Sequence, residues 1–503
     1  MKPNKIPKNC RQSGMNYLLS LFVASIILST TGAYAQTPPS VETRIGTLKF
    51  ENGFPTSETS KKLFEEMDFQ RAVQAYLWSY PLVSFESIRL AAGKEYGLAD
   101  FDFGIADNFM DTKSVYLTAN STTIYAFTNV DLGKSGPVVV EIPPGPIVGI
   151  IDDFFQRSLT DVGLAGPDGD KGGKFLLLPP GYAGEVPQEG YHVLKALMNN
   201  YNIMIRGLVS NFGPDVPVAV QRVKQMKAYP WSERNSPKAN KFVSVSGATI
   251  NTLPPPGLEY WSRLSDVINN NPVEDRDRFY HAMLKPMGIE KGKPFQPDAR
   301  QKAILEEATK LGEAMSRNML FNGEDRINGA TAFAGTHWNW VVLVNPKQEG
   351  EFYSQVDERI HYTYGAIYTS PGIGVWKAGP GATYIQTFKD KEGNRMTGDK
   401  SYKMHIPANI PAATFWSLTL YSSDIRSMIQ NKSNMSAHSQ YDKLKVNSDG
   451  SIDLFFSPKA PADKSNWIET NPGQGFYPMF RLYGPKAGAF DGTWKLPDIE
   501  LVK

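Results

Sequence analysis

The spacing of hydrophobic residues divides this chain into helical and strand-like regions. Hydrophobic residues recur at helical spacing from residue 56 to 92, and again in five segments between 215 and 369. Short apolar runs separated by Gly, Pro, Asn and Asp fill residues 115–209 and 383–499, a pattern typical of strands joined by turns. This order of elements predicts a β-rich α+β fold: two antiparallel β-sandwich or jelly-roll-like domains, with a helical N-terminal segment and a helical middle region.

Two local signals refine the predicted helices. Pro81 lies inside the first helical pattern, where a proline kinks or ends a helix. Asp298 followed by Gln301 predicts a capping box at the start of a helix that runs to residue 321.

Residues 1–35 have the features of a secretory signal peptide. Four cations and no acid precede an apolar core at 17–28, and Ala33-Tyr34-Ala35 is a small-x-small cleavage motif. The apolar core is too short to span a bilayer. We therefore expect cleavage after Ala35 and a mature protein that is periplasmic or secreted. Cys10, the only cysteine, would leave with the signal, so we expect no disulfide and no cysteine ligand.

The pattern divides the rest of the chain into three domains. Residues 36–212 are predicted to form an N-terminal helix plus β-sandwich domain, 213–375 a mainly helical connecting region, and 376–503 a C-terminal β-sandwich domain. Loss of the signal changes the net charge from +2 to about −2, which argues against a nucleic-acid partner. No later apolar run is long enough for a transmembrane segment, so we expect none in the mature chain.

Two adjacent acids, Asp152 and Asp153, interrupt the apolar run at residues 147–155. Side chains alternate between the faces of a strand, so one of these carboxylates must lie on the buried side. A buried carboxylate is costly unless it is paired, hydrogen-bonded or protonated, and Arg157, Asp161 and Lys174 are the nearest groups that could share the charge. These five residues are our candidate catalytic set, as acid and base or as oxygen ligands of a cation. The alternative is an internal salt bridge that fixes a loop.

A second group of candidates lies in the C-terminal region. Aromatic walls with a few fixed cations suit a small apolar or carboxylate-bearing ligand, and packing in a core is the alternative. Arg481 needs a partner, because it stands between two hydrophobic residues. Arg206 stands in a similar apolar run in the N-terminal β region, so we expect the two β regions to be structurally similar. The predicted ligand-binding residues are Trp416, Tyr421, Arg426, Arg481 and Tyr483.

Common catalytic and cofactor motifs are absent from the sequence. It has no G-x-S-x-G, no H-E-x-x-H, no phosphate loop and no dinucleotide fingerprint. No two of its six histidines have metal-binding spacing, and His337 with His361 would be the first candidates for a site built from distant histidines. Asp168-Gly169-Asp170 is only a fragment of a calcium loop. The sequence therefore assigns neither a metal nor a cofactor.

Several sequence blocks are distinctive in combination: MDFQRAVQAYLW from residue 67, LTANSTTIY from 117, GPDGDKGGKFLLLPPGY from 166, FWSLTLY from 415, NWIET from 466 and FRLYGP from 480. Together they resemble bacterial exported proteins with paired domains of unknown function, number 1254 toward the N-terminus and number 1214 toward the C-terminus. Such proteins often have an acid where Thr122 stands. The resemblance implies two β-rich domains with an inserted helical region, and it implies no reaction.

These observations predict an exported soluble protein that binds or processes a small organic molecule at a polar or aromatic site. The alternative is a non-catalytic, envelope-associated or structural protein that forms a homo-oligomer. The sequence leaves open whether the chain is an enzyme.

Overall fold

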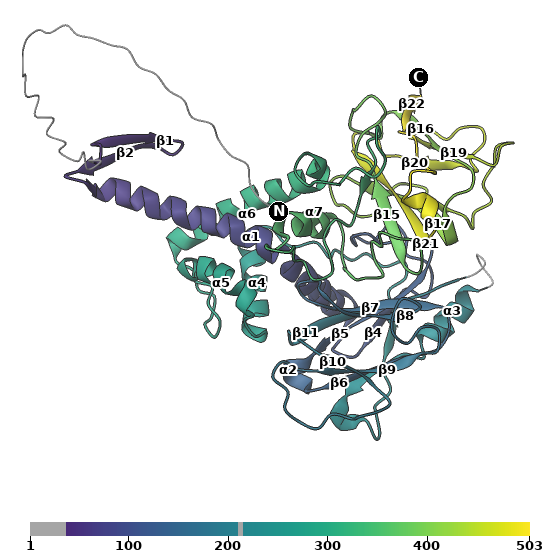
Figure 1. Ribbon diagram of the computed structural model, residues 1–503, viewed down its shortest axis with the longest axis horizontal. Coiled ribbons are helices and arrows are strands. Elements are labelled where there is room, and N and C mark those ends of the chain that lie inside the picture. Colours follow the sequence, from purple (N-terminus) through teal and green to yellow (C-terminus); the bar gives the residue numbers. More distant parts are fainter. Residues whose placement is uncertain (1–36, 210–214, 503) are drawn as a thin grey trace, which may run out of the picture. The chain divides into compact units, whose positions relative to one another are not determined.

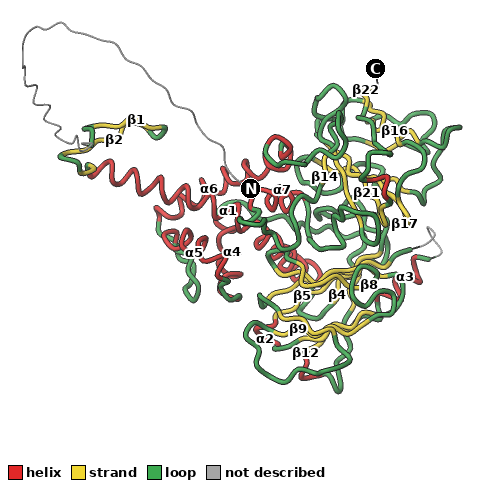
Figure 2. The backbone as a smooth tube through the Cα atoms, viewed as in Figure 1, coloured by secondary structure: helices red, strands yellow, loops and turns green. Residues whose placement is uncertain are grey.

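The longer helices and most of the strands occupy different parts of this chain (Figures 1 and 2). The computed structural model describes residues 37–209 and 215–502, so the predicted signal peptide lies outside the described residues. The chain forms two compact units, Met1–Phe64 and Glu65–Lys503. The predicted β-rich α+β class is confirmed. Within residues 37–209 and 215–502, no helix combines the length and the apolar character that crossing a bilayer requires.

The first unit holds a small antiparallel sheet and the start of a long helix. The sheet consists of β1 (Ser40–Thr43), β2 (Gly46–Glu51) and β3 (Phe54–Pro55), in that order. Helix α1 (Ser57–Tyr96) begins here and continues into the second unit, close to the range that the spacing predicts. Pro81 lies inside α1, so the helix does not end there. Most residues between 72 and 88 are buried, which makes this part of α1 a core helix.

Two sheets form the N-terminal β region of the second unit. Strands β5 (Ile124–Asp131), β7 (Ile147–Asp153) and β11 (Asn200–Gly207) lie inside the larger sheet with both faces covered, so almost every one of their residues is buried. The six-stranded sheet has the order β13 (Phe242–Ser244), β4 (Phe103–Ile105), β5 (Ile124–Asp131), β11 (Asn200–Gly207), β7 (Ile147–Asp153), β8 (Ser158–Gly163). The four-stranded sheet has the order β10 (His192–Lys195), β9 (Gly173–Leu178), β6 (Val138–Ile142), β12 (Lys227–Pro230).

Most of the helices after α1 lie in the middle of the chain. The helices after α1 are α2 (Leu132–Ser135), α3 (Val216–Val223), α4 (Leu258–Asn270), α5 (Arg278–Leu284), α6 (Ala299–Phe321) and α7 (Val356–Gly365). The predicted capping box opens α6: the Asp298 carboxylate accepts a hydrogen bond from Gln301 N at 2.8 Å, and the Gln301 side chain accepts one from Asp298 N at 2.9 Å. The domain boundaries at residues 212 and 375 remain predictions, because Glu65–Lys503 is one compact unit.

The C-terminal β region also consists of two sheets. The five-stranded sheet has the order β14 (Asn339–Trp340), β15 (Ala382–Gln386), β21 (Phe476–Pro485), β17 (Ala412–Ser422), β18 (Ala437–Ser439). The four-stranded sheet has the order β20 (Trp467–Glu469), β19 (Ile452–Ser457), β16 (Ser401–Ile406), β22 (Glu500–Val502).

The five-stranded sheet contributes to two different cores. Trp416 and Phe480, on one face, belong to a core shared with the four-stranded C-terminal sheet. Phe415, Tyr421 and Tyr483, on the other face, belong to the core that also contains α1 and the six-stranded sheet. The alternation of side chains along β17 and β21 therefore decides which residues meet the N-terminal region. Sandwich packing of either β region remains a prediction.

Candidate functional site

Asp153 is a buried carboxylate with a counter-charge, as the sequence predicts for this motif. It ends β7, is 3% exposed, and accepts a hydrogen bond from Arg157 Nε at 2.9 Å. Arg157 also pairs with Glu274 at 2.5 Å and lies 3.8 Å from Asp277. Burial raises the pKa of Glu274 to about 6 against the opposing charge of Arg157. These four residues form an internal ion-pair network, which matches the structural alternative for this motif.

Asp152, the neighbouring acid, points to the opposite face of β7. It is 0% exposed, and its Oδ2 accepts a hydrogen bond from Thr369 N at 3.0 Å. Its Oδ1 has no hydrogen-bond partner among the described residues. Burial, helped by the charge of Asp153, raises the pKa of Asp152 well above its usual value. The site therefore favours the neutral carboxylic acid.

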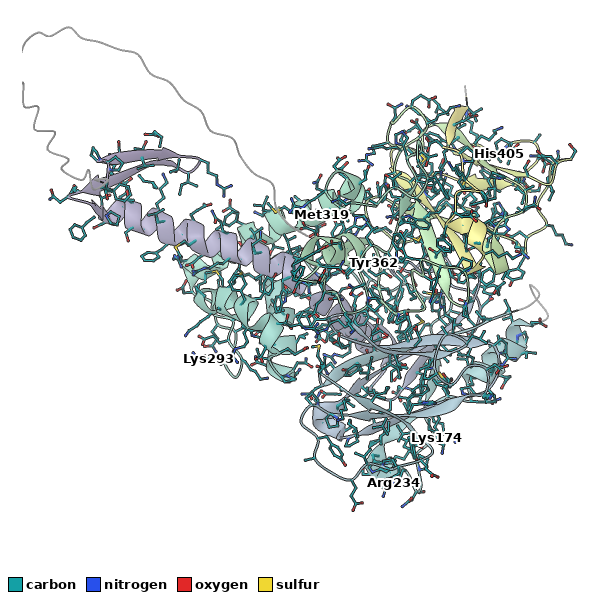
Figure 3. The ribbon with its side chains drawn as sticks, in the orientation of Figure 1. Lys174, Arg234, Lys293, Met319, Tyr362 and His405 are labelled. Carbon is teal, nitrogen blue, oxygen red and sulfur yellow. The ribbon has the colours of Figure 1, made fainter. Side chains whose placement is uncertain are left out.

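Asp161 and Lys174 lie on two further strands, β8 and β9. Asp161, on β8, accepts a hydrogen bond from Gly372 N at 2.8 Å, and burial raises its pKa. Lys174, on β9, is exposed and lies 3.5 Å from Glu141; Figure 3 shows it well apart from Tyr362. The five predicted catalytic residues are thus divided among four places, and the structure does not bring them together as one set.

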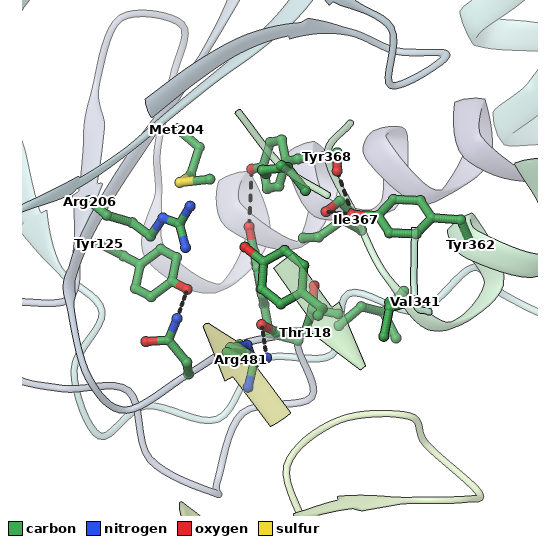
Figure 4. Close-up of a pocket in the computed structure, with 15 residues that line it drawn as sticks. Thr118, Tyr125, Met204, Arg206, Val341, Tyr362, Ile367, Tyr368 and Arg481 are labelled. Atoms are coloured by element: carbon green, nitrogen blue, oxygen red, sulfur yellow. Dashed lines mark hydrogen bonds between the residues drawn. The ribbon is translucent and has the colours of Figure 1, made fainter. Parts of the chain in front are cut away.

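A small cavity instead brings together residues from both β regions (Figure 4). Its volume is about 40 Å³. Arg206 reaches it from β11 and Arg481 from β21, and tyrosines make up much of the rest of its wall. The tyrosines are Tyr116, Tyr125, Tyr362, Tyr368 and Tyr384.

Arg481 is held by neutral groups. It is 1% exposed and lies beside Tyr384 of β15 in the strand register. Its Nη1 donates to Thr419 Oγ1 at 2.9 Å, and its Nη2 donates to Thr118 O at 3.1 Å and to the Tyr421 hydroxyl. Within the described residues, no carboxylate lies close enough to Arg481 to form an ion pair.

Among the described residues, Arg206 has fewer hydrogen-bond partners than Arg481. It is 7% exposed, lies beside Tyr125 of β5 in the register, and is within hydrogen-bonding reach of the Tyr384 side chain. Its Nε has no partner among the described residues, and in Figure 4 its guanidinium points into the group of tyrosines. Arginine keeps its proton in proteins. The charge of Arg206 opposes the rise in the pKa of Asp161 that burial causes, so the Asp161 carboxylate is within electrostatic reach of Arg206. In the part of the chain that the structure describes, neither Arg206 nor Arg481 forms an ion pair with an acid.

The tyrosine hydroxyls around the cavity are neutral hydrogen-bonding groups. Burial raises the pKa of Tyr116, Tyr362 and Tyr368 above the usual value, so these hydroxyls keep their protons. The Tyr368 hydroxyl donates to Asn202 Oδ1 at 2.6 Å and lies 3.3 Å from the Tyr116 hydroxyl. The wall can therefore supply hydrogen bonds but no negative charge of its own.

Two residues in the cavity wall have a strained backbone. Thr118 has a φ of 50° and Tyr368 a φ of 65°, in the left-handed region that side chains other than glycine rarely adopt. Such strain costs about 1–3 kcal/mol per residue and gathers at ligand sites, where the surrounding structure holds it in place. Strain at two wall residues is independent support for a functional site here.

A larger cavity adjoins the small one. Its volume is about 550 Å³, and it shares Arg206 and Ile373 with the small cavity. Residues of β7 and β8, the segment 372–382 and the ends of β17 and β21 form its wall. Asp161 and Tyr483, from the two predicted sets, also line it.

Strand alternation divides the predicted ligand-binding residues. Arg481, Tyr421 and Tyr483 share the face of the sheet that meets the N-terminal region. Arg481 lines the small cavity, Tyr483 lines the larger one, and Tyr421 accepts a hydrogen bond from Arg481. Trp416 lies on the opposite face and stacks on Phe480, with ring centroids 5.5 Å apart.

Arg426 is also separate from the cavities. Its guanidinium lies 4.0 Å from the centroid of the Tyr364 ring and donates to Tyr364 O at 3.0 Å. Arg206, by contrast, was singled out in the sequence only as the counterpart of Arg481 and was not in the predicted site. Its place in the middle of an apolar strand was the signal that could have identified it.

The predicted histidine and calcium candidates have structural partners. His361 is buried with its Nδ1 2.7 Å from Met319 O, and burial lowers its pKa. The backbone N of His337 donates to Asp498 Oδ1 at 2.7 Å. Asp168 accepts a hydrogen bond from Gly163 N at 2.8 Å. Among residues 37–209 and 215–502, no group of three His, Cys, Asp or Glu side chains could hold a metal ion.

Two families of unknown function match the chain. Residues 102–230 match the family described as Protein of unknown function (DUF1254), and residues 381–487 match the one described as Protein of unknown function (DUF1214). The predicted pairing of the two domains is confirmed. The DUF1254 match contains Arg206 and the DUF1214 match contains Arg481, so each domain supplies one arginine to the small cavity.

One solved structure supports the fold. The crystal structure of the VPA0106 protein from Vibrio parahaemolyticus is similar over 87% of this chain and 100% of its own, with a TM-score of 0.55 and 21% identity. An uncharacterized protein from Burkholderia cenocepacia is similar over 88% of this chain and 97% of its own, with a TM-score of 0.39 and 11% identity. No curated protein matches the chain. The VPA0106 likeness shows the fold of the paired domains and no activity.

Proposed function

We propose that this protein binds a small organic anion in the cavity between Arg206 and Arg481. The observation that carries the proposal is the pair of buried guanidinium groups without an ion-paired carboxylate in the described residues. The anion is a carboxylate, because the planar guanidinium presents parallel N–H groups that match its two oxygens.

Electrostatics supports this occupant. A charge taken out of water costs several kcal/mol unless a partner compensates it, and here two like charges line one cavity. Neutral acceptors compensate Arg481 in part, whereas Arg206 keeps an unpartnered Nε. A bound anion would add charge-assisted hydrogen bonds, each stabilising by about 1.5–3 kcal/mol.

The size of the small cavity also supports a compact head group. Its volume of about 40 Å³ could hold a few water molecules or one carboxylate group. Phenol hydroxyls and the unpartnered Arg206 Nε converge there, which is the usual composition of a small-molecule site: a largely apolar wall with a few fixed polar groups.

The test is a titration of the purified mature chain with monocarboxylates, from acetate to benzoate and hexanoate, followed by calorimetry and by the shift in Tm. At least one carboxylate should bind the wild type, and Arg206→Gln should weaken it by roughly 10- to 150-fold, the loss of one charged hydrogen-bonding partner. A structural homo-oligomer with no ligand predicts no binding, so failure of the whole panel overturns the proposal.

Arg359→Gln is the matched control. Arg359 is also buried and also has an unpartnered Nε, but it lines neither cavity. This variant should keep the affinity for the carboxylate, because it leaves the walls of both cavities unchanged. Equal loss of affinity in both variants would show that any buried arginine is needed for folding and that the cavity is not a binding site.

We also propose that the chain is exported, with cleavage after Ala35. The support is the basic segment, the apolar core and the Ala33-Tyr34-Ala35 motif. Fractionation of bacterial cells followed by N-terminal sequencing tests this: the mature protein should start at Gln36 outside the cytoplasm, and an intact Met1 in the cytoplasm would contradict it.

A further inference from the structure

We infer that the anion carries an apolar tail, so that the ligand is an amphipathic monocarboxylate with its head between Arg206 and Arg481 and its tail in the larger cavity. This inference rests on the proposed function and deepens it, since it names the class of ligand. The supporting observation is that the two cavities share two wall residues, Arg206 and Ile373.

The volumes divide the ligand into two parts. The small cavity, of about 40 Å³, has room for a head group and little else. The larger cavity, of about 550 Å³, has the size of ordinary small-molecule sites, which run from about 300 to 1,000 Å³. Arg206 and Ile373 belong to the walls of both. A ligand whose head contacts Arg206 and whose chain is too long for the small cavity can therefore extend into the larger one.

The chemistry of the larger wall selects an apolar tail. Hydrophobic side chains come from β7 and from the C-terminal sheet, including Val148, Ile150 and Phe415. The Asp161 carboxylate in this wall already accepts hydrogen bonds from Gly372 N and from the Ser370 side chain. Asp161, Thr414 and Lys486 are polar groups of this wall, but most of its surface is apolar, so burial of apolar surface is the main interaction that it offers.

Small residues make the space for the tail. Gly372, Gly381, Ala382 and Ala413 line the cavity from the segment 372–382 and from β17. Residues without a long side chain leave space in this wall. A wall of this kind accommodates an extended chain and forms few hydrogen bonds with it.

A series of straight-chain monocarboxylates tests the inference, from acetate through butyrate and hexanoate to decanoate, with the matching primary alcohols as head-group controls. Each methylene that enters the larger cavity should tighten binding about three- to fourfold. The alcohols should bind much more weakly at every length. Alkyl phosphates of equal length distinguish the head group: tighter binding of the phosphates would overturn the choice of a carboxylate.

Ala413→Trp fills the larger cavity and separates the two claims. Ala413 is exposed and lines this cavity but not the small one. The variant should abolish the gain with chain length and leave the affinity for acetate unchanged. Ala462→Trp, in an exposed segment outside both cavities, is the control and should bind the whole series like the wild type.

The outcomes are distinguishable. If no carboxylate binds, or if Arg206→Gln has no effect, the proposed function itself fails. If acetate binds in an Arg206-dependent way but decanoate gains nothing, or if Ala413→Trp leaves the dependence on chain length intact, the proposed function stands and the apolar tail is refuted.

Discussion

Asp153→Asn and Asp152→Asn should have different effects on stability, although the two residues are adjacent on β7. Asp153 pairs with Arg157 at 2.9 Å. Asp152 contacts no cation among the described residues, and burial raises its pKa well above the usual value. Asn has the shape of Asp but cannot carry its charge. The first substitution removes one partner of a buried ion pair, and the second replaces a neutral acid with a neutral amide.

The size of the first effect follows from the network. Removal of one partner of a buried pair costs about 3–5 kcal/mol. Arg157 keeps Glu274 at 2.5 Å, and an Asn can still accept the hydrogen bond from the backbone N of residue 157, so we expect about 3 kcal/mol. With an unfolding entropy of about 2 cal/mol/K per residue, Asp153→Asn should lower Tm by about 3 °C.

The second effect depends on pH. The folded state binds the Asp152 proton more tightly than the unfolded state does, so this group makes the wild type less stable as the pH rises above 3.8. The stabilisation from protonated Asp152 is fully present below pH 3.8 and is lost as the pH rises through the pKa of Asp152 in the folded state. Asn does not titrate, so Asp152→Asn should gain stability relative to wild type with rising pH, by at most about 1.4 kcal/mol per pH unit.

Thermal or denaturant unfolding of the three proteins between about pH 4 and pH 8 measures both effects. Asp153→Asn should be less stable than wild type near neutral pH, and Asp152→Asn should be at least as stable as wild type there. If Asp152→Asn lost as much stability as Asp153→Asn at pH 7, Asp152 would be an ionised, paired group, and the reasoning from its missing counter-charge would be refuted.

Three further substitutions test the fold and the division of the predicted site. Gly163→Ala should destabilise by more than about 2 kcal/mol in urea unfolding, because Gly163 has a φ of 70° and a Cβ there would lie 2.1 Å from Ile147 O; a neutral result would contradict the turn geometry. Asp298→Ala should cost about 1 kcal/mol by the same assay through loss of the helix cap, and an unchanged midpoint would argue against that cap. Lys174→Ala should change stability by less than about 0.5 kcal/mol and leave carboxylate affinity intact, since it removes only an exposed pair with Glu141; lost affinity would return Lys174 to the site.

The local sequence determined most of the elements. A run rich in β-branched apolar residues predicts β6 (Val138–Ile142) at its observed bounds, and the Asp298–Gln301 pair marks the start of α6. Strand β8 (Ser158–Gly163) was missed, because SLTDVG has no apolar run and becomes a strand through its pairing with β7. Local signals succeed where a segment carries its own burial pattern, and they fail where pairing with a distant strand decides.

By itself the sequence also determined that charge must lie inside the protein. Alternation along β7 puts a carboxylate on the buried side, and Arg481 stands between hydrophobic residues in β21, so both require partners. Only the tertiary structure decided which partners these are. Asp153 pairs with Arg157, which also pairs with Glu274, whereas Arg481 meets Arg206 in one cavity and forms no ion pair with an acid in the described residues. The physical reason is that periodicity fixes the face on which a side chain lies, while the packing of sheets far apart in the chain selects what that face contacts.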